Sequence, residues 1–248
     1  MKKCTLVIIG IFIISFLNIK ADVKIFGTNV CEDTYLTEEW ADCSEGGYHT
    51  FYIHPTGMGM EKRALIKFKN IFKSDGGTIA NGSTIESAFL KLSHYGENYV
   101  FNPGKFEIYR VKKAWGEGTL TKSDREQGAA CWLQGKYGLP SSKWEIAGCD
   151  GENDRTQVPG GKGEVLSVND GIVSFDIDIT SIVKEWSNGE PNYGFIIISK
   201  GLGRDGNWPG FSFISRNDKI PNSSLLTIEY SASSIENTNW GKVKQLFR

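Results

Sequence analysis

Apolar and polar residues alternate with a period of two through much of this sequence. Between Arg63 and Lys69, the residues Ala64, Ile66 and Phe68 share one face, and basic side chains share the other. The same pattern recurs in four further segments: 85–94, 105–111, 173–178 and 226–230. A period of two, with many β-branched and aromatic residues, is typical of strands with one buried face. Clusters of Gly, Asn, Asp and Pro separate the segments, as turns require, so the pattern predicts an all-β fold.

One short helix interrupts this pattern near Trp186. Ile182, Val183 and Trp186 fall on one helical face, which predicts that they pack against the strands. Thr180 or Asp178 can cap the start of this helix.

Two other segments depart from the alternation. Phe195 to Ile198 is apolar on both faces, which predicts a central strand of a sheet. The segment from Gly116 to Gly171 is polar, rich in glycine and poor in periodicity, so we expect long loops there.

The first residues have the layout of a secretory signal peptide. Two lysines precede an apolar run from Leu6 to Leu17, and Ala21 offers a small residue for cleavage. The run of about 12 residues is too short to cross a bilayer comfortably, although an uncleaved anchor is the alternative. We therefore expect residues 1–21 to be a signal peptide, residues 22–231 a single β-sandwich domain and residues 232–248 a C-terminal tail. The protein would then be secreted, with no membrane attachment after cleavage.

Four cysteines follow the predicted cleavage site: Cys31, Cys43, Cys131 and Cys149. An even number of cysteines in an exported chain indicates two disulfides. Four cysteines allow three pairings, of which we expect the two short loops, Cys31–Cys43 and Cys131–Cys149. Four reduced, buried thiols are the alternative. Metal ligation has little support, because the sequence contains no Cys-x-x-Cys pair.

Charge and motifs narrow the classes of function. The formal net charge is −1, with acidic and basic residues interspersed, so no basic patch indicates nucleic acid or an anionic membrane. Neither His-Glu-x-x-His nor Gly-x-Ser-x-Gly occurs. Residues 201–206 match Gly-x-Gly-x-x-Gly, but Trp208 and Pro209 follow where a dinucleotide site needs a helix. We therefore expect no enzyme; the alternative is a glycosidase or lyase that uses a pair of surface carboxylates.

Several segments of the chain occur in a particular order: 33–36, 63–68, 85–92, 111–118, 175–183 with Trp186, 192–195 and 213–216. This ordered set resembles the DNRLRE-type domain, also called disaggregatase-related, over about residues 30–230. The resemblance implies a jelly-roll-like β-sandwich of two antiparallel sheets, here with one short helix. It also implies a non-catalytic carbohydrate-binding module for an extracellular or cell-wall polysaccharide, because that family is grouped with such modules.

Aromatic residues are the candidates for contacts with a sugar. Pyranose rings have apolar faces, which Trp and Tyr side chains can hold while polar groups fix the hydroxyls. Trp115 and Trp186 match family positions that look structural, and we place both in the core. The candidate site residues are Trp208, Arg204, Asp205, Trp40, Trp132 and Tyr137. Trp208 comes first, because Arg204 can donate hydrogen bonds to hydroxyls or a carboxylate and Asp205 can accept them. For each ring, packing beneath a loop is the alternative.

One loop is a candidate calcium site. Asp150, Glu152 and Asp154 place carboxylates at alternating positions, and such hard oxygen ligands suit Ca²⁺. A solvated loop is the alternative, because Arg155 stands where an EF-hand loop would have glycine. Structural calcium is the one cofactor that the sequence raises.

The C-terminal segment Trp240–Arg248 is amphipathic and is a candidate contact with a cell-surface or protein partner. It motivates the alternative function, a structural or adhesive extracellular protein without glycan binding.

Overall fold

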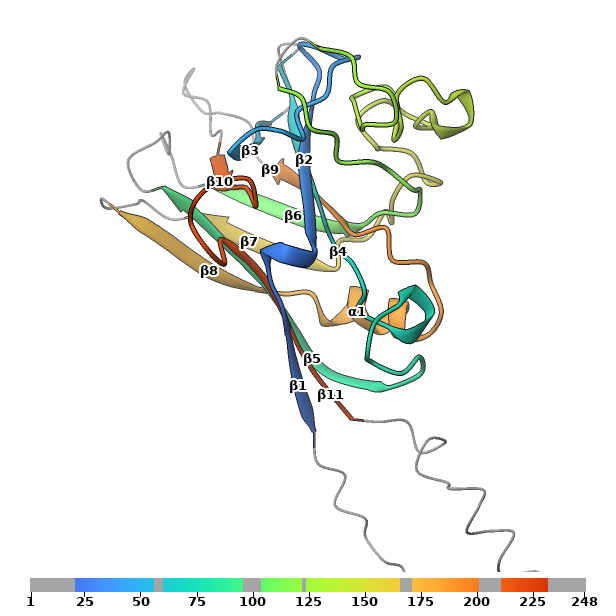
Figure 1. The fold of residues 1–248 in the computed structure, drawn as a ribbon, viewed down its shortest axis with the longest axis vertical. Coiled ribbons are helices and arrows are strands. Elements are labelled where there is room, and N and C mark those ends of the chain that lie inside the picture. Colours follow the sequence, from blue (N-terminus) through green and yellow to red (C-terminus); the bar gives the residue numbers. More distant parts are fainter. Residues whose placement is uncertain are drawn as a thin grey trace, which may run out of the picture.

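Two antiparallel sheets pack face to face in the computed structural model, which describes residues 21–55, 60–95, 104–121, 124–165, 171–200 and 211–231 (Figure 1). The four-stranded sheet has the order β1-β11-β5-β8. Its strands are β1 (Asp22–Phe26), β11 (Ser224–Ser231), β5 (Thr84–Tyr95) and β8 (Ile172–Asp178). The five-stranded sheet has the order β2-β4-β9-β6-β7. Its strands are β2 (Cys31–Thr37), β4 (Lys62–Phe68), β9 (Phe195–Lys200), β6 (Gly104–Arg110) and β7 (Gly161–Val165).

The remaining elements are short. A ribbon of β3 (Thr50–Ile53) and β10 (Phe211–Ile214) adds a two-stranded sheet to the two that were predicted. Single 3-10 turns form at η1 (Thr28–Val30), η2 (Lys73–Asp75) and η3 (Pro140–Ser142). The prediction of an all-β sandwich with one short α-helix is confirmed.

The main core lies between the two large sheets. The inward-facing residues of β4 are Ala64, Ile66 and Phe68, as the alternation predicted. They meet residues of the opposite sheet such as Leu90 and Ile228, and all five side chains are fully buried. The strand predicted to be central, β9, is the middle strand of its sheet and is buried on both faces.

The helix α1 (Thr180–Ser187) packs against β5. Ile182, Val183 and Trp186 are buried in the main core, as predicted. The Asp178 carboxylate accepts a hydrogen bond from the Thr180 N–H at 2.8 Å, so Asp178 helps to begin the helix. No helix in the described part of the chain is long and apolar enough to cross a membrane.

A second core covers the outer face of the five-stranded sheet. Leu65 and Ile196 point away from the main core and pack with Trp132 and Trp144, which belong to the long loops after β6. Trp115 is also buried there, as predicted, and its indole N–H donates to the Tyr193 carbonyl at 2.7 Å. The loops lie beside the upper part of this sheet in Figure 1, in yellow-green. Much of the described part of the segment predicted as long loops is irregular, although residues 161–165 form β7.

The two predicted disulfides are absent: Cys31, Cys43, Cys131 and Cys149 are buried free thiols. Cys31 opens β2 and packs in the main core, whereas Cys43 follows the other end of that strand. The Cys31 thiol contacts the Glu32 carbonyl at 3.8 Å, and the Cys43 thiol contacts the Asp42 carboxylate at 3.7 Å, so these two sulfurs have different neighbours. Cys131 accepts hydrogen bonds from the amides of its own turn, while the Cys149 thiol contacts the Asp154 carbonyl at 3.7 Å, so these sulfurs face different partners.

Candidate functional site

A group of aromatic rings surrounds Lys62 beside β2, an edge strand of the five-stranded sheet. The Lys62 ammonium nitrogen lies 5.9 Å from the ring centroid of Tyr35, 5.9 Å from that of Trp40 and 5.5 Å from that of Tyr52. The Tyr48 ring lies 6.1 Å from the Tyr52 ring and 6.3 Å from the Tyr35 ring, both in edge-on arrangements. We call Tyr35, Trp40, Tyr48, Tyr52 and Lys62 the Lys62 aromatic group.

The depth of these rings differs. Tyr35 is 2% exposed and belongs to the main core, and burial raises the pKa of its hydroxyl well above the usual range. Trp40, Tyr48 and Tyr52 are half-buried, so each keeps part of its surface in solvent. The exposed His49 imidazole stacks on Tyr48, with the ring centroids 5.0 Å apart. The group therefore combines a rigid buried base with partly open aromatic surface and a cation.

The other candidate rings have different surroundings. Trp132 is 7% exposed, and Arg63 lies over its ring at 5.2 Å from the centroid. Gly148 packs against the far end of the indole, where an added Cβ would lie 2.7 Å from the ring, so Trp132 is a core residue. Tyr137 is half-buried and its backbone pairs with Gly128 and Ala129 in a turn. The remaining candidates, Trp208, Arg204 and Asp205, lie outside the described residues, as does the segment Trp240–Arg248.

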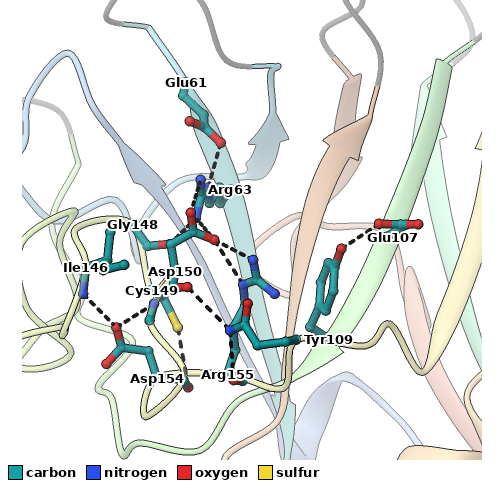
Figure 2. Close-up of polar contacts among 12 residues, drawn as sticks. Glu61, Arg63, Glu107, Tyr109, Ile146, Gly148, Cys149, Asp150, Asp154 and Arg155 are labelled. Atoms are coloured by element: carbon teal, nitrogen blue, oxygen red, sulfur yellow. Dashed lines mark hydrogen bonds and ion pairs between the residues drawn. The ribbon is translucent and has the colours of Figure 1, made fainter.

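A buried ionic network holds the loops onto the outer face of the sheet (Figure 2). The Arg63 side chain is 7% exposed and pairs with Glu61 at 2.6 Å and with Asp150 at 3.1 Å. It also donates to the Gly148 carbonyl at 2.9 Å. Arg155 pairs with Asp150 as well, and its guanidinium lies 4.1 Å from the centroid of the Tyr109 ring. Sequence reasoning missed this network, because alternation assigns Arg63 to a polar, solvent-facing side.

The carboxylates of the candidate calcium loop do not converge on one point. Asp150 is engaged by the two arginines, which lower its pKa although burial alone would raise it. Asp154 is fully buried and accepts hydrogen bonds from the N–H groups of Glu145 at 2.9 Å and Ile146 at 3.1 Å. Glu152 is exposed. Within the described ranges no three His, Cys, Asp or Glu side chains are grouped so that they could hold a metal ion. The carboxylates of Asp150 and Asp154 instead fix the shape of the loop.

A second buried acidic cluster joins β2 to the turn after β10. Asp33 is 1% exposed and accepts hydrogen bonds from the Ser215 hydroxyl at 2.5 Å and the Arg216 N–H at 2.8 Å. Burial raises its pKa to about 6, although these two hydrogen bonds act in the opposite direction. Glu117 accepts from the Asp33 N–H at 2.9 Å and pairs with the Arg216 guanidinium at 2.5 Å. Both carboxylates are therefore engaged by groups that hold the fold together. Ser215 and Arg216 do stand in one of the segments that carry the family resemblance, but nothing in the sequence marked Asp33 as their partner.

Comparison with known proteins adds no relative: no protein-family model matches the sequence, and no curated protein matches it significantly.

Proposed function

We propose that this chain is a secreted, non-catalytic carbohydrate-binding module that recognises an extracellular or cell-wall polysaccharide. The observation that carries the proposal is the Lys62 aromatic group. The resemblance of the ordered segments to the DNRLRE-type domain supports the same function.

The chemistry of the group suits a sugar. Trp40, Tyr48 and Tyr52 are half-buried, and the apolar C–H faces of a pyranose pack well on partly exposed aromatic side chains. Lys62 can donate hydrogen bonds to sugar hydroxyls, and the hydroxyls of Tyr48 and Tyr52 can donate or accept them. Because Tyr35 anchors the base in the core, the rings are held in place before a ligand arrives, which lowers the entropic cost of binding.

The absence of catalysis is part of the proposal. Paired carboxylates are the usual groups for glycoside hydrolysis. The buried pair Asp33 and Glu117 is engaged by Ser215 and Arg216, and Asp150 is engaged by Arg63 and Arg155. Incubation with a panel of polysaccharides should release no reducing ends and no unsaturated products. Release of either would show that the protein is an enzyme.

The test of binding is affinity electrophoresis of variants on gels that contain soluble polysaccharides. Trp40→Ala should lose retardation on the gel that retards the wild type, while its melting temperature stays close to that of the wild type. Trp40→Leu keeps apolar bulk without the flat ring and should also lose binding. Phe89→Ala is the matched control, because Phe89 is 41% exposed on the four-stranded sheet, outside the aromatic group. Unchanged retardation of both Trp40 variants would place the sugar elsewhere.

One observation favours the structural or adhesive alternative. On the outer face of the four-stranded sheet, Ile25, Thr227 and Phe89 are cross-strand neighbours, and Ile25 is 64% exposed. Val23 on the same strand is 58% exposed, so this face offers apolar surface to a protein partner. A wild type that is retarded by no polysaccharide would favour this alternative.

A further inference from the structure

A depression of about 480 Å³ lies at one end of the outer face of the five-stranded sheet, apart from the Lys62 aromatic group. Five charged residues of three adjacent strands line it: Lys105, Glu107, Lys162, Glu164 and Lys200. Lys105 and Glu107 of β6 alternate with Phe106 and Ile108, which face the main core. Figure 2 shows Glu107 and Tyr109 side by side.

The register of the strands places one pair of like charges directly opposite each other. Lys105 of β6 is the direct partner of Lys200 of β9 on one side and of Glu164 of β7 on the other. Like charges directly opposite each other on neighbouring strands destabilise a sheet. The lining residues comprise three lysines and two glutamates, so the depression carries an excess of positive charge.

The carboxylate of Glu107 forms ion pairs with two of the three lysines. Glu107 pairs with Lys162 at 3.3 Å and with Lys200 at 3.1 Å, and it also accepts a hydrogen bond from the Tyr109 hydroxyl. Burial alone would raise its pKa, but Tyr109 and the lysines hold the pKa below its ordinary value. Lys105 is exposed and forms no ion pair with any other described residue. Glu107 is therefore engaged by three donors, and among the described residues no carboxylate pairs with Lys105, so its ammonium group can meet an anionic ligand.

On the core side of the sheet, behind the depression, one position needs a glycine. Gly163 of β7 lies opposite Phe106, and a Cβ at this position would lie 2.1 Å from the Phe106 ring. Any side chain there would have to displace the ring, so glycine keeps the two strands and the ring in close contact. The strands that carry the charged side chains are thus held together from the core side of the sheet.

We propose that this depression binds an acidic sugar of an anionic polysaccharide, with Lys105 and Lys200 as the cations that meet its carboxylate or sulfate group. Ammonium groups donate to either anion, and the Glu164 carboxylate can accept from a sugar hydroxyl. That the anion belongs to a sugar rests on the proposed function; the charge and the register support an anion by themselves.

The experiment measures binding of three probes by titration calorimetry: oligogalacturonate for carboxylates, dextran sulfate for sulfates and neutral dextran as the uncharged reference. At least one acidic probe should bind more tightly than dextran, and its affinity should fall as salt is raised. The preferred acidic probe identifies the anionic group. Lys105→Gln combined with Lys200→Gln should weaken that binding about tenfold. Lys184→Gln, which removes an exposed lysine of α1, is the matched control and should leave binding unchanged.

A third variant distinguishes an effect of charge on binding from an effect of lost folding. Glu107→Gln releases Lys162 and Lys200 from their shared carboxylate, so it should tighten binding of the acidic probe about threefold. Loss of fold would weaken binding instead. Equal binding of acidic probes by the double lysine variant and the wild type would overturn the inference, as would weaker binding by a folded Glu107→Gln variant. If a neutral polysaccharide binds through Trp40 while the wild type shows no preference for acidic probes, the proposed function stands and only this inference fails.

Discussion

Replacing Asp33 with asparagine should change how the stability of the protein depends on pH. Asp33 is 1% exposed, and burial raises the pKa of its carboxyl from 3.8 to about 6 in the folded state. Because the folded state disfavours the ionised form, this group contributes stability that is fully present below about pH 4 and is lost as pH rises through about 6. Asparagine has the shape of the protonated carboxyl and stays neutral at every pH.

The magnitude follows from the shift in pKa. A rise of about two units corresponds to about 3 kcal/mol of unfolding free energy lost between pH 4 and pH 8. The side-chain amide of the Asp33→Asn variant would keep an acceptor for the Arg216 N–H, and the Ser215 hydroxyl can rotate to accept from the new amide. Any rearrangement of these bonds adds an offset that does not depend on pH. The unfolding free energy of the Asp33→Asn variant minus that of the wild type should therefore rise by about 3 kcal/mol over this range.

Urea denaturation of both proteins at one-unit steps from pH 4 to pH 8 measures this difference directly. Ser215→Ala is a second variant, because it removes a hydrogen bond that favours the ionised carboxylate. It should destabilise the protein more at pH 8 than at pH 4. A difference between Asp33→Asn and wild type that stays constant with pH would refute the reasoning.

Two further predictions concern the folded core. Arg63→Ala should lower the unfolding free energy by about 3 to 5 kcal/mol, because it leaves Glu61 buried without its partner; the exposed Lys184→Ala serves as control, and equal melting temperatures of the two variants would contradict the role of the network. The thiols of Cys31, Cys43, Cys131 and Cys149 should react with a thiol reagent only after unfolding, because all four are buried and burial raises the pKa of each. Peptide mapping without reduction that recovers linked pairs among them would contradict the free thiols.

The strands and the helix were predictable because their signals are local. In β4 the alternation of Ala64, Ile66 and Phe68 records which side of the strand meets the core, whatever the partner strand is. The same reasoning predicted β9 and α1. An uninterrupted apolar run indicates a strand that is buried on both faces, and apolar residues on one helical face indicate a helix that packs on that face. For the candidate site, sequence reasoning singled out Trp40 as an aromatic residue in a loop. Tyr35, Tyr48, Tyr52 and Lys62 became its neighbours only when β2, β3 and β4 came together.

What the sequence by itself determined, therefore, is the β-sandwich and the inward face of each strand. Tertiary structure decided what happens on the outward faces. The alternation of β4 places Arg63 on the side that should face solvent. Arg63 is nevertheless only 5% exposed, because a loop with Trp132 and Asp150 folds over it. The register of β6 with β9 likewise decides that Lys105 lies opposite Lys200. The physical reason is that a period of two reports the polarity of a face, whereas a contact between residues far apart in the chain depends on strand pairing and loop packing, which no local pattern records.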